Sequence, residues 1–102
     1  MNSWQKIQYR KNAFNELIDL INTTGNMPNY SESYIAEDIE DWRDWVWDVM
    51  ELIGEAFDYS YFRDYRRFVS NNKFKTYKNE VSKTLEYLII LKKIIKETYN
   101  MT

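Results

Sequence analysis

Residues 35–57 read IAEDIEDWRDWVWDVMELIGEAF, and this stretch decides the fold of the chain. Its apolar side chains recur at alternating intervals of four and three residues, which places them along one side of an α-helix. This apolar stripe consists of Ile35, Ile39, Trp42, Val46, Val49 and Ile53. The pattern predicts one long helix over about residues 34–57, with Trp47 half exposed near the edge of the buried face. Gly54 is expected to weaken this helix or to end it early.

The same helix carries a second stripe, made only of carboxylates and shifted by two positions from the apolar one. Its members, which we call the acidic stripe, are Glu37, Asp41, Asp44, Asp48, Glu51 and Glu55. Two residues correspond to a rotation of about 200° around a helix, so the acidic stripe is expected to face away from the core. Neighbouring like charges cost a helix roughly 0.2–0.5 kcal/mol per pair, so an unbroken acidic row is more than folding requires. We therefore take it as the candidate partner-binding site, with an ordinary solvated helix face as the alternative.

Three further helices are predicted outside this stretch. The first covers about residues 4–22 after an N-cap at Ser3. A short helix passes through residues 61–69, and the last runs over about 74–99. The buried side of the first helix is expected to be Ile7, Phe14, Leu17, Ile18 and Ile21. That of the last helix is expected to be Tyr77, Val81, Leu85, Leu88, Leu91 and Ile95.

The segments between the helices carry turn and capping residues. Residues 22–33 collect glycine, proline, asparagine and serine, and they are expected to form a loop. Ser31 or Ser33 is expected to cap the second helix, and Asp58 or Ser60 the third.

Composition limits the fold class. The chain has 102 residues, which suits one domain with one core. Two glycines and one proline are too few for an all-β fold with many turns. The sequence therefore predicts an all-α fold. We expect a single helical domain over residues 1–102, built as a small helical bundle of three long helices plus one short helix.

Several chemistries lack the residues that they need. The chain has no cysteine and no histidine, which excludes disulfides, zinc sites and Ser-His or Cys-His catalysis. It has no glycine-rich phosphate-binding loop. We therefore expect a protein that is not an enzyme, with no catalytic residue, no metal site and no cofactor.

The chain also lacks membrane signals. No uninterrupted apolar stretch approaches the roughly 18 residues of a membrane span. The polar N-terminus has no apolar core of a signal peptide. We therefore expect a cytoplasmic protein that does not bind membranes.

Charge is distributed unevenly along the chain. Residues 31–58 contain ten acids and one base, a net charge of −9, whereas residues 59–102 contain ten bases and four acids, a net charge of +6. Two interpretations follow. The basic half could neutralise the acidic stripe within the chain or across a symmetric homodimer. Alternatively, the stripe occupies a basic groove of a foreign protein that otherwise binds nucleic acid.

The compact, acidic, cysteine-free chain, rich in Asn, Lys, Ile and Tyr, resembles small inhibitors encoded by bacteriophages of low-GC hosts, including anti-CRISPR proteins. Several of those act as nucleic-acid mimics. The resemblance implies a phage or mobile-element inhibitor in the host cytoplasm. Its partner would be a host defence protein with a basic nucleic-acid-binding groove. The resemblance is one of composition, so it transfers no functional residue by position.

A second resemblance is local to residues 45–68, WVWDVMELIGEAFDYSYFRDYRRF. This segment is similar to a Trp-led helix followed by Phe-Gly, Ser, Tyr and Phe, found in helical domains of some bacterial antiphage effectors. The corresponding residues here are Trp45 or Trp47, Ser60, Tyr61 and Phe68. Asp58 stands where that pattern has Gly. The resemblance implies a structural or regulatory helical module for sensing or oligomerisation.

Two minor alternatives concern other charged patterns. Glu37, Glu40, Glu55 and Asp58 resemble the metal-binding signature of Mg-dependent all-α nucleotide pyrophosphatases. That site needs facing helices, whereas one continuous helix would separate the two halves by about 27 Å. The Tyr/Phe/Arg-rich segment 57–68 could stack on nucleic-acid bases, but we favour buried aromatics with arginines facing water. Direct nucleic-acid binding would use Arg63, Arg66, Arg67, Lys73, Lys75 and Lys78.

Overall fold

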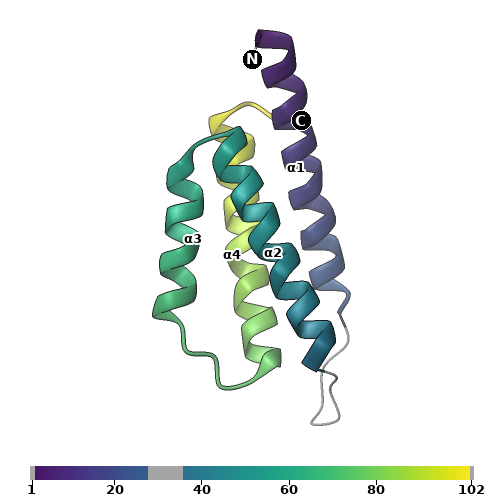
Figure 1. Ribbon diagram of the computed structural model, residues 1–102, viewed down its shortest axis with the longest axis vertical. Helices are drawn as coiled ribbons and strands as arrows, with labels where there is room; N and C mark the ends of the chain where they lie inside the picture. The colour runs from purple at the N-terminus through teal and green to yellow at the C-terminus, as the bar shows by residue number, and fades with distance from the viewer. Residues whose placement is uncertain (1, 28–35, 102) are drawn as a thin grey trace.

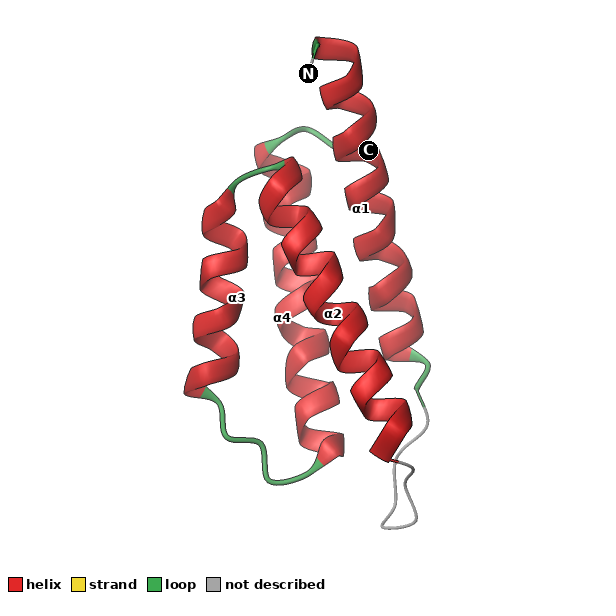
Figure 2. Cartoon of the chain, viewed as in Figure 1, coloured by secondary structure: helices red, strands yellow, loops and turns green. Residues whose placement is uncertain are grey.

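The computed structural model describes residues 2–27 and 36–101 of the chain. In this part of the chain the protein forms four α-helices and no strand (Figure 2). They are α1 (Ser3–Gly25), α2 (Ala36–Ala56), α3 (Tyr59–Asn71) and α4 (Tyr77–Thr98). The predicted all-α fold is confirmed. With 13 residues α3 is the shortest helix, but that is an ordinary length, so the division into three long helices and one short helix is not confirmed.

Consecutive helices run in opposite directions and pack as a small up-and-down bundle (Figure 1). Helix α1 packs against both α2 and α4, and α2 packs against α3. The first turns of α1 project beyond the ends of the other helices (Figure 1). This projection explains why Ile7, which was predicted to be buried, is exposed. Across residues 2–27 and 36–101, no helix is both long and apolar enough to cross a membrane.

Helix α2 supplies much of the core. Five members of the apolar stripe are buried, namely Ile39, Trp42, Val46, Val49 and Ile53. The sixth, Ile35, lies outside the described residues. Each such side chain contributes about 1.5–3 kcal/mol when it is fully buried. The other helices pack against this stripe with Phe14, Leu17, Leu20, Phe62, Leu88 and Ile95.

The start of α1 differs by one residue from the prediction. Asn2, not Ser3, is the N-cap, because its Oδ1 accepts a hydrogen bond from the backbone N–H of Gln5 at 2.8 Å. The Gln5 side chain accepts in return from the Asn2 backbone N–H at 3.1 Å, which completes a capping box. At its other end α1 continues to Gly25, past the predicted end at residue 22. The predicted caps Ser31 and Ser33 lie outside the described residues.

Gly54 does not end α2 early, because the helix continues to Ala56, so this part of the expectation was wrong. Gly54 is buried, and a Cβ atom added there would lie only 2.8 Å from the Cβ of Phe62 on α3. The glycine therefore permits a close approach of α2 and α3. The predicted cap of α3 is confirmed at Asp58, whose Oδ1 accepts from the backbone N–H of Ser60 at 2.8 Å.

Helix α4 begins at Tyr77 rather than at residue 74, after an N-cap at Thr76. The hydroxyl oxygen of Thr76 accepts from the backbone N–H of Asn79 at 3.1 Å. Tyr77 is exposed, contrary to the prediction. The buried side of α4 consists of Thr84, Leu88, Leu91 and Ile95. Phe74 lies in the segment before the helix and packs against Phe68, with 6.1 Å between ring centres.

One arginine of α1 contacts the C-terminal ends of two other helices. Arg10 of α1 donates from Nε to the backbone oxygen of Ala56, the last residue of α2, at 3.0 Å. Its guanidinium carbon also lies 4.9 Å from the ring centre of Tyr99, which caps α4, and 5.7 Å from that of Phe57. A cation at the C-terminal end of a helix interacts favourably with the helix dipole. Arg10 thus connects α1 to the C-terminal ends of α2 and α4.

Candidate partner-binding surface

The acidic stripe lies along a single unbroken helix. Asp41, Asp44, Asp48, Glu51 and Glu55 are all exposed, on the side of α2 opposite its buried residues. The backbone of Glu37 belongs to the first turn of α2, but its side chain lies outside the described part of the structure. The continuity of α2 therefore holds these carboxylates in one row on the surface.

The basic half of the chain forms no ion pair with the described members of this row. Among the side chains that the structure describes, every ion pair involves Arg43, Arg63 or Arg67, and none involves Asp41, Asp44, Asp48, Glu51 or Glu55. The lysines of α4 form no ion pair in the same part of the chain. The stripe residue with a hydrogen-bonded side-chain partner there is Glu55, which accepts from the phenol of Tyr9 at 2.7 Å. Internal neutralisation, one of our two interpretations of the charge pattern, is therefore not observed among the described residues.

The Tyr9–Glu55 contact fixes one end of the row to α1. The hydrogen bond to the Glu55 carboxylate raises the pKa of the Tyr9 phenol, and partial desolvation adds to this effect. Tyr9 therefore stays protonated and neutral around pH 7 and donates to Glu55 without cancelling its negative charge.

Arg43 is the one base of α2, and its contacts direct it toward α4. Its Nε donates to Glu80 Oε2 at 2.7 Å, and one terminal nitrogen donates to Glu80 Oε1 at 2.6 Å. The guanidinium carbon also lies 5.4 Å from the ring centre of Tyr77. This charge-assisted, bidentate pair raises the pKa of Arg43. The one cation of α2 is thus paired with a carboxylate of another helix, and the stripe keeps its uniform sign.

The Tyr/Phe/Arg-rich segment 57–68 is mainly structural. Phe57, Phe62 and Tyr65 are buried, as the preferred interpretation of these aromatics required. Arg63, Arg66 and Arg67 are exposed on the outer side of α3. Arg66 lies over two rings of its own helix, 5.7 Å from the centre of Tyr59 and 5.1 Å from that of Phe62. The aromatics that could stack on nucleic-acid bases are therefore largely committed to the core or to an arginine.

The carboxylate pattern of the pyrophosphatase alternative is not assembled. Because α2 is one uninterrupted helix, the backbone positions of Glu37 and Glu55 lie near opposite ends of the same rod. Among residues 2–27 and 36–101, no group of three or more acidic side chains is close enough to hold a metal ion.

Comparison of the chain with protein-family models, with curated proteins and with solved structures finds no match. A function for this protein is therefore inferred from its surface.

Sequence reasoning missed the residues that set the charge of this surface. Arg43 and Glu80 are 37 positions apart, and Tyr9 and Glu55 are 46 apart. Neither pair has a local spacing signal, because each depends on how two helices pack. The sequence offers one partial signal, the single base Arg43 within an otherwise acidic helix, but this signal does not indicate which carboxylate pairs with it.

Proposed function

We propose that this protein acts by binding another protein through its acidic stripe. The partner is a nucleic-acid-binding protein with a basic groove, and the bound stripe excludes nucleic acid from that groove. The observation that supports this proposal is the row of exposed carboxylates on α2, which has no ion pair with any described base. The protein would thus be an inhibitor of the kind that the compositional resemblance implies.

The dimensions of the stripe suit such a groove. Glu37 and Glu55 are 18 residues apart, which corresponds to about 27 Å along a helix, with a carboxylate about every 5 Å. A DNA duplex of the same length carries roughly 16 phosphate charges. The stripe is therefore less densely charged than a duplex. The stripe would compete with nucleic acid through a few charge-assisted contacts to arginine and lysine side chains of the partner's groove, rather than through its total charge.

The electrostatic origin of this binding has kinetic and salt signatures. Complementary charge accelerates association, and screening over about 8 Å at physiological ionic strength weakens interactions between exposed charges. We therefore expect fast association and an affinity that falls steeply as salt is raised.

The test reverses three charges at the centre of the stripe. The triple variant Asp44→Lys, Asp48→Lys and Glu51→Lys should abolish binding to a partner captured from bacterial lysate, and should also abolish competition with that partner's nucleic acid. A matched control, Glu16→Lys, Asp19→Lys and Glu97→Lys, makes the same change in net charge at exposed positions outside the stripe. Both variants should keep the helical circular-dichroism signal. Binding that survives in the stripe variant, or that is lost equally in both, would show that the proposal is wrong.

A second candidate function is self-association of a structural or regulatory module. The observation that favours it is on α4, where Ile89, Ile90 and Ile94 are exposed among lysines. In a two-fold dimer, this apolar and basic face of one copy would meet the acidic α2 of the other. Sedimentation across a salt series separates the two functions. A dimer that dissociates at high salt supports self-association, whereas a monomer at all salt concentrations leaves the stripe available to a foreign protein.

A further inference from the structure

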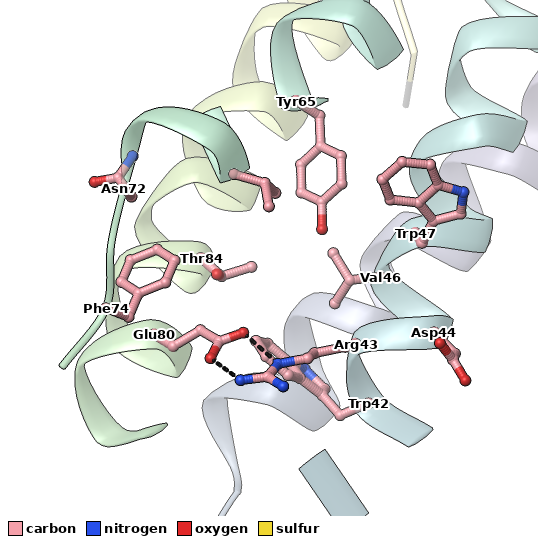
Figure 3. A pocket seen from close by; sticks show the side chains of 11 residues that line it. Trp42, Arg43, Asp44, Val46, Trp47, Tyr65, Asn72, Phe74, Glu80 and Thr84 are labelled. Carbon is pink, nitrogen blue, oxygen red and sulfur yellow. Dashed lines mark hydrogen bonds and ion pairs between the residues drawn. The ribbon is translucent and has the colours of Figure 1, made fainter. Parts of the chain in front are cut away.

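A cavity of about 430 Å³ lies between α2, α3 and the start of α4, beside the acidic stripe (Figure 3). Its walls are mainly apolar and include Trp42, Val46, Trp47, Tyr65, Val69 and Phe74. Trp47 and Val69 are exposed to solvent, so they mark the mouth of the cavity. The volume is within the range of about 300–1,000 Å³ that is typical of small-molecule sites.

A buried phenol points into this cavity, and its hydroxyl has no hydrogen-bond partner among the described residues. Tyr65 is only 6% exposed, and Figure 3 shows its hydroxyl directed toward the space above Arg43 and Glu80. No other described residue forms a hydrogen bond with this hydroxyl. Burial raises the pKa of Tyr65 to about 12, so the phenol is protonated and can donate. A buried polar group without a partner costs roughly 1–3 kcal/mol, which favours occupation of the cavity by a molecule that can accept this hydrogen bond.

The floor of the cavity adds further donors but no net charge. Thr84 lines the cavity, is only 4% exposed, and likewise has no hydrogen bond to a described residue through its hydroxyl. Arg43 uses two of its five N–H groups on Glu80, whose side chain is 14% exposed, and the pair is neutral as a unit. At the edge, Asp44 adds a negative charge that disfavours anions.

We infer that this cavity binds a neutral, planar heteroaromatic molecule that carries a hydrogen-bond acceptor on one edge, a class that includes nucleobases. The ring would pack against the aromatic wall formed by Tyr65 and Trp47, which contact each other edge to face with 6.2 Å between ring centres, and Phe74 lines the cavity as a further aromatic surface. The acceptor would face the Tyr65 hydroxyl, with the Thr84 hydroxyl and the remaining N–H groups of Arg43 nearby. This inference does not rest on the proposed protein-binding function, because the cavity is lined mainly by apolar side chains, although Asp44 at its edge also belongs to the acidic stripe.

Three probes of similar shape test each element of this inference. Quinoline has a ring nitrogen acceptor, naphthalene replaces that nitrogen with a C–H group, and 2-naphthoate adds a negative charge. Binding to the full chain is followed by the NMR shifts of the tryptophan indole N–H groups and the Thr84 methyl group. We expect quinoline to bind roughly 2–10-fold more tightly than naphthalene, the difference that one net hydrogen bond provides. Naphthoate should bind more weakly than either neutral probe.

Two variants and one control variant show whether binding takes place in this cavity. Tyr65→Phe keeps the ring and removes the donor, so it should abolish the preference for quinoline over naphthalene while naphthalene still binds. Val69→Trp fills the mouth from an exposed position and should abolish binding of both probes without loss of helical signal. The control Tyr59→Phe removes an exposed hydroxyl from the same helix. It should change neither the binding of the two neutral probes nor the preference for quinoline over naphthalene. The inference is overturned if no probe shifts these signals, as for a cavity that holds only water. It is also overturned if the preference for quinoline persists in Tyr65→Phe, or if neutral probes bind equally in all variants.

Discussion

The substitution Gly54→Ala should destabilise the protein, although alanine is a better helix former than glycine. Helix α2 continues through Gly54, so propensity alone predicts a gain of about 1 kcal/mol from alanine. The added Cβ, however, would lie 2.8 Å from the Cβ of Phe62, whereas carbon atoms prefer separations of about 3.5–4.0 Å. Helices α2 and α3 would have to move apart locally by about 1 Å.

The cost of this movement can be bounded. Overpacking a core usually costs about 1–3 kcal/mol. Both clashing atoms are Cβ atoms, which no rotamer change can move, so we expect a value near the upper end of that range. After subtraction of the propensity gain, the net loss is about 2 kcal/mol, which corresponds to a decrease in Tm of about 8 °C for a domain of this size.

Urea and thermal unfolding, followed by circular dichroism, measure this loss. Gly25→Ala is the matched control, because the nearest atom to its added Cβ is Leu85 Cδ2 at 3.9 Å, an ordinary contact. The control should be neutral or should stabilise the protein by up to about 1 kcal/mol. The close approach of α2 and α3 at Gly54 is refuted if Gly54→Ala unfolds at or above the wild-type temperature with its helical signal intact.

Two further predictions concern Tyr65 and Glu80. Since burial raises the pKa of Tyr65 from 10.0 to about 12, the unfolded chain loses this proton first. Stability should therefore be constant below about pH 9 and fall by roughly 2.3 kcal/mol by pH 12. Urea unfolding from pH 8 to pH 12 tests this, and an equally steep fall in Tyr65→Phe would contradict it. Glu80→Gln should weaken the bidentate contact with the half-exposed Arg43 and lower the free energy of unfolding by about 1 kcal/mol, a value discounted for solvent screening. Urea unfolding of Glu80→Gln beside Glu86→Gln, an exposed acid of the same helix, checks the second prediction, and equal losses in both would count against it.

The sequence was most informative about α2. Its two stripes have the same spacing, so one helix had to bury the first and expose the second, and the structure shows this for every described member of both. The buried side of α4 was only half predicted. Leu88, Leu91 and Ile95 are buried, but Tyr77 is exposed, and Thr84 takes the place expected for a larger apolar residue. A polar threonine gives no hydrophobic signal, so its burial depends on the neighbouring helices.

Two of the features that sequence reasoning could not provide depend on packing between helices, and one depends on a local contact. Gly54 was interpreted by its helix propensity, whereas its role depends on how closely α3 approaches. The N-cap was assigned to Ser3, but serine and asparagine cap almost equally well, and the reciprocal contact with Gln5 favours Asn2. The cavity beside Tyr65 combines residues from α2, α3 and α4, and no spacing in the sequence brings them together.

The position of Arg10 has a consequence for how the bundle opens. Because one guanidinium contacts both Ala56 and Tyr99, fraying at the end of α2 removes a contact that also supports the end of α4. Helix ends usually exchange their amide hydrogens independently, through small local openings. In this protein the amide hydrogens in the last turns of α2 and α4 should instead exchange together. These two helix ends would open as one cooperative unit, because both are held by Arg10 of α1.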